Sequence, residues 1–106
     1  MWANYIKERE GFETLESEHA FLVYKISGEE CYIKDIFVEK EHRRFNLGTE
    51  LADKCVQIAR DAGCKFISGT VVPSTNGATV SMMSLLAYGF TIRAAQNDLI
   101  ILIKEI

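Results

Sequence analysis

The apolar residues of this chain follow a strand period in the first third and a helix period after it. From position 11, "FETLES" alternates, "AFLVYKI" is apolar and rich in β-forming residues, and "ECYIKDIFV" alternates before ending apolar at Ile36, Phe37 and Val38. Gly28 separates the last two segments. The pattern predicts two β-hairpins in this region.

The period then changes to that of an amphipathic helix. Apolar residues three or four apart form one face, at Leu47, Leu51, Cys55, Ile58 and Ala62. Gly63 is placed to end this helix. The next segment, "KFISGTVV", is typical of a short buried strand, which Pro73 closes.

A second helix is expected in "STNGATVSMMSLLAYGF". It starts with the cap-type residues Ser74, Thr75 and Asn76 and stops at Gly89. Its apolar positions are Val80, Met83 and either Leu86 or Ala87. The segments "FTIR" and "DLIILIKEI" then predict two final strands around a loop at Ala94–Asn97.

The predicted order is β-β-β-α-β-α-β-β. A strand, a helix and a further strand imply a parallel crossover within a mixed sheet, so the fold class is α/β. The 106 residues suffice for one domain, which we place at 1–106.

The composition makes several classes of function unfavourable. The formal net charge of −3 disfavours nucleic acid as a partner. No apolar run is long enough to span a membrane, and the first residues show no signal peptide. Three cysteines without a CxxC spacing fit reduced thiols. These features predict a cytoplasmic protein.

The segment "VEKEHRRFNLGTEL" joins the third strand to the first helix. A helix start offers unpaired N–H groups and a positive dipole, which together bind anions. Gly48 lets a phosphate approach the backbone, Asn46 tolerates a left-handed conformation, and Arg43 and Arg44 add forked donors. The alternative is a purely structural turn. Neither a GxxxxGK[ST] nor a GxGxxG motif is present.

This segment resembles the acetyl-CoA-binding segment of GNAT-type N-acetyltransferases. In that family, a strand ending in Val and a short loop precede [RQ]-x-x-G-x-[GA] at the start of a long helix. Arg43 matches the first position, Asn46 the first glycine and Gly48 the second. "KFISGTVV" matches the next strand, and "YGF" resembles the close of the second conserved segment, so the resemblance extends from about Gly11 to the C-terminus.

The resemblance implies a GNAT-like fold with acetyl-CoA as co-substrate. The pyrophosphate would sit on backbone amides of the turn, with Arg43 near the phosphates. The strand before it would splay from its neighbour and pair through its backbone with the pantetheine arm, while its side chains pack mostly in the core. The residues so implied are Ile36, Phe37, Val38, Arg43, Arg44, Phe45, Asn46, Leu47, Gly48 and Thr49. Asn46 in place of glycine should have φ > 0 or lie in a turn that spares it.

The general base is left open by the sequence. Some members of the family carry a Glu fourteen residues before the first glycine, and that position is Tyr32. A tyrosine with an ordinary pKa of about 10 is a weak base at pH 7. Glu30, two residues away on the same strand face, could act through water. The alternative is that Tyr32 is a packed strand aromatic.

The general acid is open as well. The family commonly has Tyr-x-x-x-Gly-Phe, and Leu85 stands at the tyrosine position. Tyr88 is displaced by three positions, and Ser84 is closer to the expected site. Asn76 precedes the helix, as an Asn often does in the family, and would contribute to cofactor binding. Its alternative role is an N-cap or a turn with Gly77.

The acceptor side departs from the family, whose members usually begin with a strand and one or two helices. About ten residues precede Gly11, too few for that unit. The N-terminal helical region is thus truncated, and the acceptor site is either open, for a protein or peptide lysine or N-terminus, or completed by a second copy in a homodimer.

These observations predict transfer of an acetyl group from acetyl-CoA to a primary amine by direct attack in a ternary complex. The alternative is a catalytically weak or inactive CoA-binding module that acts through a protein partner. No metal is expected, because His19 and His42 are far apart without metal-ligand spacing. The three cysteines suit packing.

Overall fold

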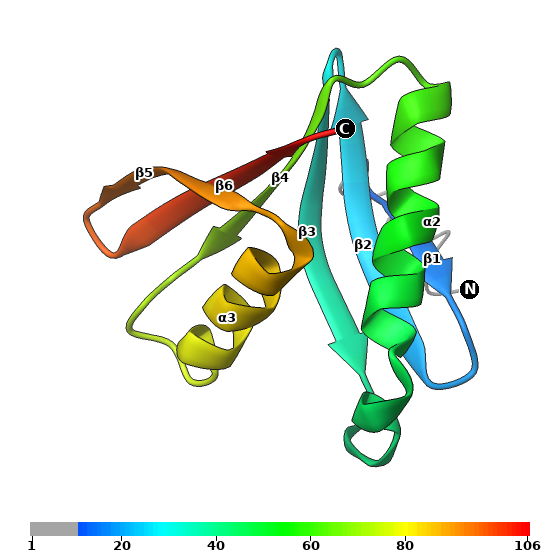
Figure 1. Cartoon of the computed structure of the whole chain (residues 1–106), viewed down its shortest axis with the longest axis vertical. Helices are drawn as coiled ribbons and strands as arrows, with labels where there is room; N and C mark the ends of the chain where they lie inside the picture. Colours follow the sequence, from blue (N-terminus) through cyan, green and yellow to red (C-terminus); the bar gives the residue numbers. More distant parts are fainter. Residues whose placement is uncertain (1–10) are drawn as a thin grey trace.

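The computed structural model describes residues 11–106, without the side chains of Arg44 and Phe45. Within that range the chain forms a mixed sheet, two α-helices and one 3-10 helix (Figure 1). The elements are β1 (Glu13–Glu16), β2 (Ala20–Ser27), β3 (Glu30–Val38), η1 (Lys40–Phe45), α2 (Leu47–Asp61), β4 (Phe66–Val71), α3 (Ala78–Tyr88), β5 (Thr91–Gln96) and β6 (Leu99–Glu105).

The sheet has the strand order β1-β2-β3-β4-β6-β5. Among the strands in residues 11–106, β3 and β4 are the only parallel pair, and they are joined by the crossover through α2. The other neighbours are antiparallel, as expected for hairpins and short returns. The α/β class and the element order predicted from the sequence are therefore confirmed.

The last hairpin is tighter than expected. β5 continues to Gln96, and the turn consists of Asn97 and Asp98, with φ of 52° and 60°. Asn and Asp tolerate this left-handed conformation, which matches the twist of a two-residue hairpin. The loop expected at Ala94–Asn97 was thus placed too early, because Ala94 and Ala95 carry a weak strand signal.

The second α-helix also begins later than expected. Its N-cap is Gly77. Ser74 instead bonds the side chain of Asp98, through its backbone N–H at 3.0 Å and through its hydroxyl. Ser74 therefore links the loop before α3 to the β5–β6 turn, whereas the Thr75 hydroxyl donates to the carbonyl of Val72 within the loop.

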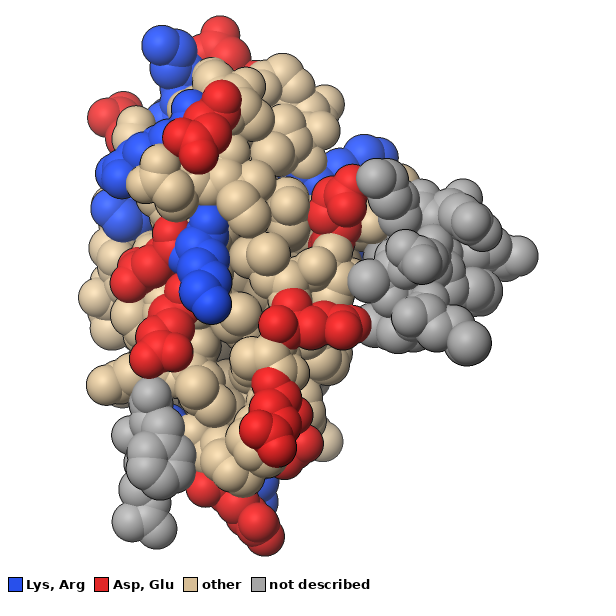
Figure 2. Space-filling model, turned by 90° about the vertical axis from the view of Figure 1, so that its right-hand side faces the viewer, with Lys and Arg blue, Asp and Glu red and all other residues tan. Residues whose placement is uncertain are grey.

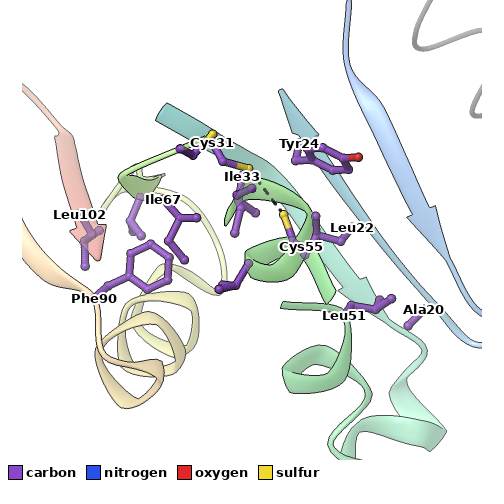
Figure 3. Close-up of a cluster of buried hydrophobic side chains, with 14 residues drawn as sticks. Ala20, Leu22, Tyr24, Cys31, Ile33, Leu51, Cys55, Ile67, Phe90 and Leu102 are labelled. Carbon is purple, nitrogen blue, oxygen red and sulfur yellow. Dashed lines mark hydrogen bonds between the residues drawn. The ribbon is translucent and has the colours of Figure 1, made fainter. Parts of the chain in front are cut away.

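Both helices lie on the same face of the sheet. Cys55 of α2 contacts Cys31 of β3, with 3.6 Å between the sulfur atoms (Figure 3). Leu85 of α3 lies over Gly69 of β4, on the same side of the sheet by strand alternation. The core between helices and sheet contains, among others, Leu22, Cys31, Leu51, Cys55, Ile67, Phe90 and Leu102. The predicted packing role of the cysteines is confirmed, since all three are buried.

The surface carries mixed charge. On the side shown in Figure 2, basic side chains lie mainly in the upper half together with acidic ones, and the lower half is predominantly acidic. In residues 11–106, no helix has both the length and the apolar character required to cross a membrane.

Candidate functional site

The parallel pair β3–β4 separates halfway along β3. Pairing runs from Glu30 opposite Phe66 to Ile33 opposite Gly69 and then stops. Figure 1 shows the two strands diverging toward their carboxyl ends. Lys34 is an extra residue in the β2–β3 pairing, which makes a bulge where the separation begins. Beyond Ile33, the described part of β4 is therefore not paired with β3, which leaves residues 35–38 without a strand partner on that side, as the predicted splay requires.

The turn that follows β3 joins a 3-10 helix to the start of α2. η1, which the sequence analysis treated as plain loop, leads into Asn46 at φ 56° and ψ 25°. The expectation that Asn46 has a positive φ is confirmed. Asn46 makes no side-chain capping bond to α2. The N–H groups of the first turn of α2 thus keep their capacity to bind an anion.

Gly48, in the first turn of α2, lies close to the end of β3. A methyl group added at Gly48 would lie 3.6 Å from Cγ2 of Val38 and 3.8 Å from Cδ1 of Ile36. The unpaired edge and the helix start are therefore adjacent, and a ligand could contact both. Their assignment to CoA binding stays a prediction.

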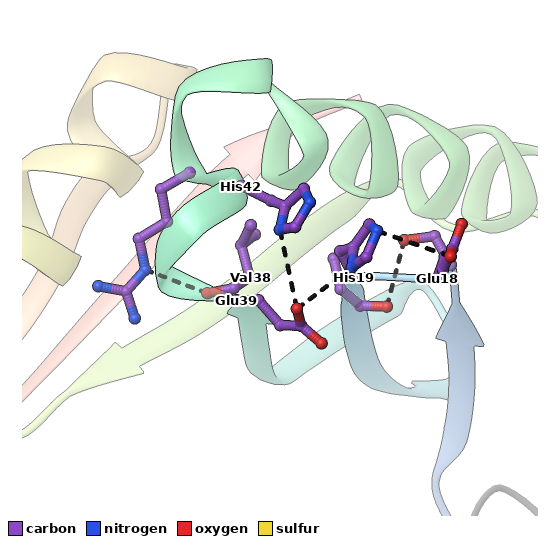
Figure 4. A network of polar contacts seen from close by, with 8 residues as sticks. Glu18, His19, Val38, Glu39 and His42 are labelled. Carbon is purple, nitrogen blue, oxygen red and sulfur yellow. Dashed lines mark hydrogen bonds and ion pairs between the residues drawn. The ribbon is translucent and has the colours of Figure 1, made fainter.

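Arg43 also reaches the end of β3. Its Nε donates a hydrogen bond of 3.0 Å to the carbonyl oxygen of Val38 (Figure 4). The guanidinium group is thereby held at the end of β3, where its positive charge would favour a phosphate bound nearby. For Arg44 and Phe45, only the backbone is described.

The side chains of Ile36 and Phe37 were expected to be mostly buried, and this was wrong. They are 40% and 44% exposed. Phe37 stacks on Phe21, with 5.6 Å between ring centroids, and Ile36 lies beside the start of α2. Both residues lie beyond the last pair with β4, so no neighbouring strand covers them on that side. Val38 is half-buried.

Two hydrogen-bonded side-chain pairs link β3 to β4. The Tyr32 hydroxyl lies 3.1 Å from Oγ1 of Thr70, and the Ser68 hydroxyl donates to Oε2 of Glu30 at 2.5 Å. By strand alternation these four side chains lie on the face opposite both helices. The Tyr32–Thr70 pair is at the point of separation, and the Glu30–Ser68 pair is two residues before it. Ser68 and Thr70 were missed from the sequence, although their alternation in "ISGT" was a signal.

The remaining candidates do not gather at the separation point. Tyr88 donates a hydrogen bond of 2.6 Å to Asp53 of α2. Burial, and then this bond to Asp53, raise the pKa of Tyr88. Ser84 is exposed on α3, and Asn76 is exposed in the turn before it. Their proposed roles, and that of Tyr88, stay predictions.

The two histidines are not far apart in space, contrary to the expectation from their spacing. The rings of His19 and His42 stack with centroids 3.6 Å apart. The start of β2 and η1 meet here, because Ala20 pairs with Val38 at the adjacent strand ends.

Comparison with known protein families shows the family to which the chain belongs. The model of the Acetyltransferase (GNAT) family matches residues 8–88. This match covers most of the chain, which therefore belongs to the GNAT acetyltransferase family. No curated protein is detectably similar in sequence.

Solved structures show the same fold at low identity. A candidate GNAT acetyltransferase from Desulfovibrio desulfuricans superposes with a TM-score of 0.79 and 15% identity, covering 96% of this chain and 75% of that one. PaiA N-acetyltransferase from Thermoplasma acidophilum, in complex with coenzyme A, gives 0.77 and 14%, covering 95% and 66%. A Bacillus subtilis acetyltransferase in complex with CoA gives 0.73 and 15%, covering 97% and 83%.

Proposed function

We propose that this protein is an N-acetyltransferase that transfers an acetyl group from acetyl-CoA to a primary amine. The observation that carries the proposal is the adjacency of the unpaired edge of β3 to the uncapped start of α2, with Arg43 bonded to the end of the same strand. The family membership and two structural neighbours solved with CoA support it.

The turn would hold the pyrophosphate. Its donors are the backbone amides from Arg44 to Thr49, helped by the dipole of α2. The left-handed Asn46 orients this backbone without offering its side chain as a competing cap. Arg43 would add charge-assisted bonds to the phosphate oxygens.

The pantetheine arm would lie along β3. Residues Ile36, Phe37 and Val38 offer backbone N–H and C=O groups in the manner of an additional strand. The Val38 carbonyl accepts from Arg43, so the arm would have to displace that bond or use the neighbouring groups. This path leads from the turn toward Lys34, where the strands part and where the thioester would arrive.

The transfer itself needs no covalent enzyme intermediate. The amine nitrogen attacks the thioester carbonyl, the new C–N bond forms, and the C–S bond breaks to release the CoA thiolate. A backbone N–H of β3 would stabilise the oxyanion. The amine loses one proton, and the thiolate takes one up.

The groups that could move these protons lie on the face of the sheet opposite α2 and α3. The Tyr32–Thr70 pair lies beside the expected thioester position. Glu30 lies farther back on β3, by about 7 Å along the strand. It could receive the amine proton through water and Tyr32. Ser84 and Tyr88 are on the helix side, and the bond of Tyr88 to Asp53 leaves it the less suitable acid.

One observation favours the alternative function, a CoA-binding module with little activity. Leu85, at the position of the family's tyrosine, packs over Gly69. An apolar group there supplies no proton to the departing thiolate.

Two measurements test the proposal. A thermal-shift titration with acetyl-CoA should raise the melting temperature, since a ligand that binds the native state stabilises it. No rise at millimolar acetyl-CoA would exclude both the enzyme and the CoA-binding module. CoA release with a panel of amines and lysine peptides then separates these two: turnover identifies the enzyme, and binding without turnover favours the module.

A further inference from the structure

The start of β2 and the helix η1 bring two imidazoles and one carboxylate together. Oε2 of Glu39 lies 3.2 Å from Nδ1 of His19 and 3.7 Å from Nδ1 of His42 (Figure 4). The two rings are nearly parallel, at an angle of 7°. Potential ligand atoms of all three residues lie within 4.8 Å of one another.

The backbone fixes this arrangement. The N–H of Glu39 donates to the carbonyl of His19 at 2.9 Å, and the N–H of His42 donates to the carbonyl of Glu39 at 2.8 Å. His19 precedes a strand, Glu39 follows its partner strand, and His42 lies one 3-10 turn after Glu39. The cluster therefore rests on hydrogen-bonded backbone at each of its three residues.

We propose that His19, Glu39 and His42 bind a borderline divalent metal ion, with Zn²⁺ as the best match. Two imidazoles and one carboxylate are a donor set that suits Zn²⁺ and related transition metals, whereas Mg²⁺ and Ca²⁺ prefer oxygen ligands alone. This proposal departs from the expectation that the chain holds no metal. It does not depend on the proposed acetyl transfer.

The distances suit a shared ion. With metal–ligand bonds of about 2.0–2.2 Å, two ligand atoms of a tetrahedral site lie about 3.3–3.6 Å apart. The separations of 3.2 and 3.7 Å within the cluster are close to that range. The carboxylate oxygen is thus already at a suitable distance from one nitrogen of each imidazole.

The ring planes require one adjustment. Parallel rings direct their nitrogen lone pairs along parallel planes, so one imidazole must rotate about its Cβ–Cγ bond to face a common ion. The side chains of His19 and His42 are 33% and 30% exposed, so a rotation does not disturb the core.

The surroundings favour a cation. Oε1 of Glu18 lies 3.8 Å from Nε2 of His19, the ring nitrogen that is not the one near Glu39, so a second carboxylate adds negative charge beside the cluster. A surface hollow lined by Glu16, Glu18, His19 and Glu39, among others, adjoins the cluster. The hollow leaves room for water as a fourth ligand, and its acidic side chains attract a positive ion.

A bound ion would connect β2 to η1. Since η1 ends at Phe45, directly before the N-cap residue Asn46 of α2, the ion would anchor the segment that leads into the start of α2. We therefore expect Zn²⁺ to stabilise the fold, by an amount that grows with its free concentration.

The test is titration of the chelator-treated protein with Zn²⁺ and, in parallel, with Co²⁺. We expect a saturable rise in melting temperature with Zn²⁺ at about one ion per chain. Co²⁺ should give visible d–d bands typical of four-coordination without a sulfur-to-cobalt charge-transfer band. Such a charge-transfer band would assign the metal to the cysteines and overturn the proposal.

Variants locate the site. His19→Gln and His42→Gln should each weaken Zn²⁺ binding by at least about tenfold, since each removes one of three protein ligands. The matched control is Glu41→Gln, which makes the same charge change as Glu39→Gln in the same segment but lies outside the cluster. The proposal predicts loss of binding in Glu39→Gln and retention in Glu41→Gln. Unchanged Zn²⁺ affinity in both histidine variants, each verified as folded by circular dichroism, would overturn it; if one does not fold, the other decides.

Discussion

The phenolic oxygen of Tyr32 lies 3.1 Å from Oγ1 of Thr70, across the point at which β3 and β4 stop pairing. The residues are 38 positions apart in the chain and come from the two strands that the α2 crossover joins. This contact lies where the β3–β4 pairing ends. The pantetheine arm is proposed to bind along the part of β3 that follows. A hydroxyl pair at this position can both tie the strands together and conduct a proton.

The two possible roles of the Tyr32–Thr70 pair predict different effects of substitution on kcat. If Tyr32 relays a proton, Tyr32→Phe lowers kcat at least about tenfold and leaves the KM for acetyl-CoA unchanged, because general acid–base groups contribute about 10²–10⁴-fold. Thr70→Val removes the same bond but leaves the phenol, and it should lower kcat less. Steady-state kinetics of both variants provide the comparison. Equal, small losses in the two would assign the pair a structural role only.

Gly48→Ala should separate cofactor binding from stability. The added methyl group meets only ordinary contacts with Val38 and Ile36, and Ala is the better helix former by up to about 1 kcal/mol. The free protein should therefore be as stable as the parent or more so, while acetyl-CoA binding weakens because the methyl group covers the amides. Calorimetric titration and thermal melting measure the two effects.

Gly63→Ala is the control at the other end of the same helix. Gly63 has open space around it but a φ of +88°, which an L-residue adopts only with strain. This variant should lose about 1 kcal/mol of stability and keep its affinity for acetyl-CoA. Parent-like affinity in Gly48→Ala would place the ligand elsewhere.

Substitutions at Asn46 test the strained residue of the turn. Asn46→Gly should bind acetyl-CoA at least as tightly as the parent, since glycine adopts φ of 56° without a Cβ penalty. Asn46→Val should lower the free energy of unfolding by about 1–2 kcal/mol and weaken binding, because a β-branched residue resists this conformation. Urea denaturation with and without ligand gives both quantities. A stable, tightly binding Val variant would show that the left-handed turn is not required.

Tyr88 should make stability depend on alkaline pH. Burial and the bond to Asp53 raise its pKa in the folded protein, so the folded state holds this proton more tightly than the unfolded chain. The contribution is complete below the ordinary tyrosine pKa of about 10 and is lost as pH rises through the folded pKa. Tyr88→Phe should cost about 1 kcal/mol at pH 7, and the difference from the parent should shrink above about pH 10. Urea denaturation at both pH values measures this difference, and a constant difference would contradict the assignment.

The sequence predicted those parts of the fold that rest on local periodicity. The helix from Leu47 and the strands around Gly28 were predicted because their apolar positions repeat over several turns or pairs. The helix η1 was missed, since "KEHRRF" is short, charged and without an apolar face. The end of β5 was predicted too early, because the bulge at Arg93 and the two alanines after it interrupt the alternation typical of a strand.

In the candidate site, too, the features that depend on local sequence were predicted, and those that depend on tertiary packing were not. The left-handed Asn46 could be predicted because only a few residue types tolerate that conformation. The partners of Glu30 and Tyr32 could not, since the register of β4 against β3 is set by tertiary packing. The stacked histidines, 23 positions apart, depend on the pairing of two strand ends. Ile36 and Phe37 are exposed because the strands separate before them. A continuous apolar sequence does not show where two strands separate.

The most direct test of the proposed site is a map of the amides that respond to the ligand. In a titration of the ¹⁵N-labelled protein with CoA, we expect saturable shifts of the amides of Leu47, Gly48 and Thr49 and of residues 34–38 in β3. The Gly63→Ala variant should give the same map, and Gly48→Ala should need more ligand. Shifts confined to other parts of the chain, such as the hollow around Asp53, Tyr88 and Lys104, would contradict the account.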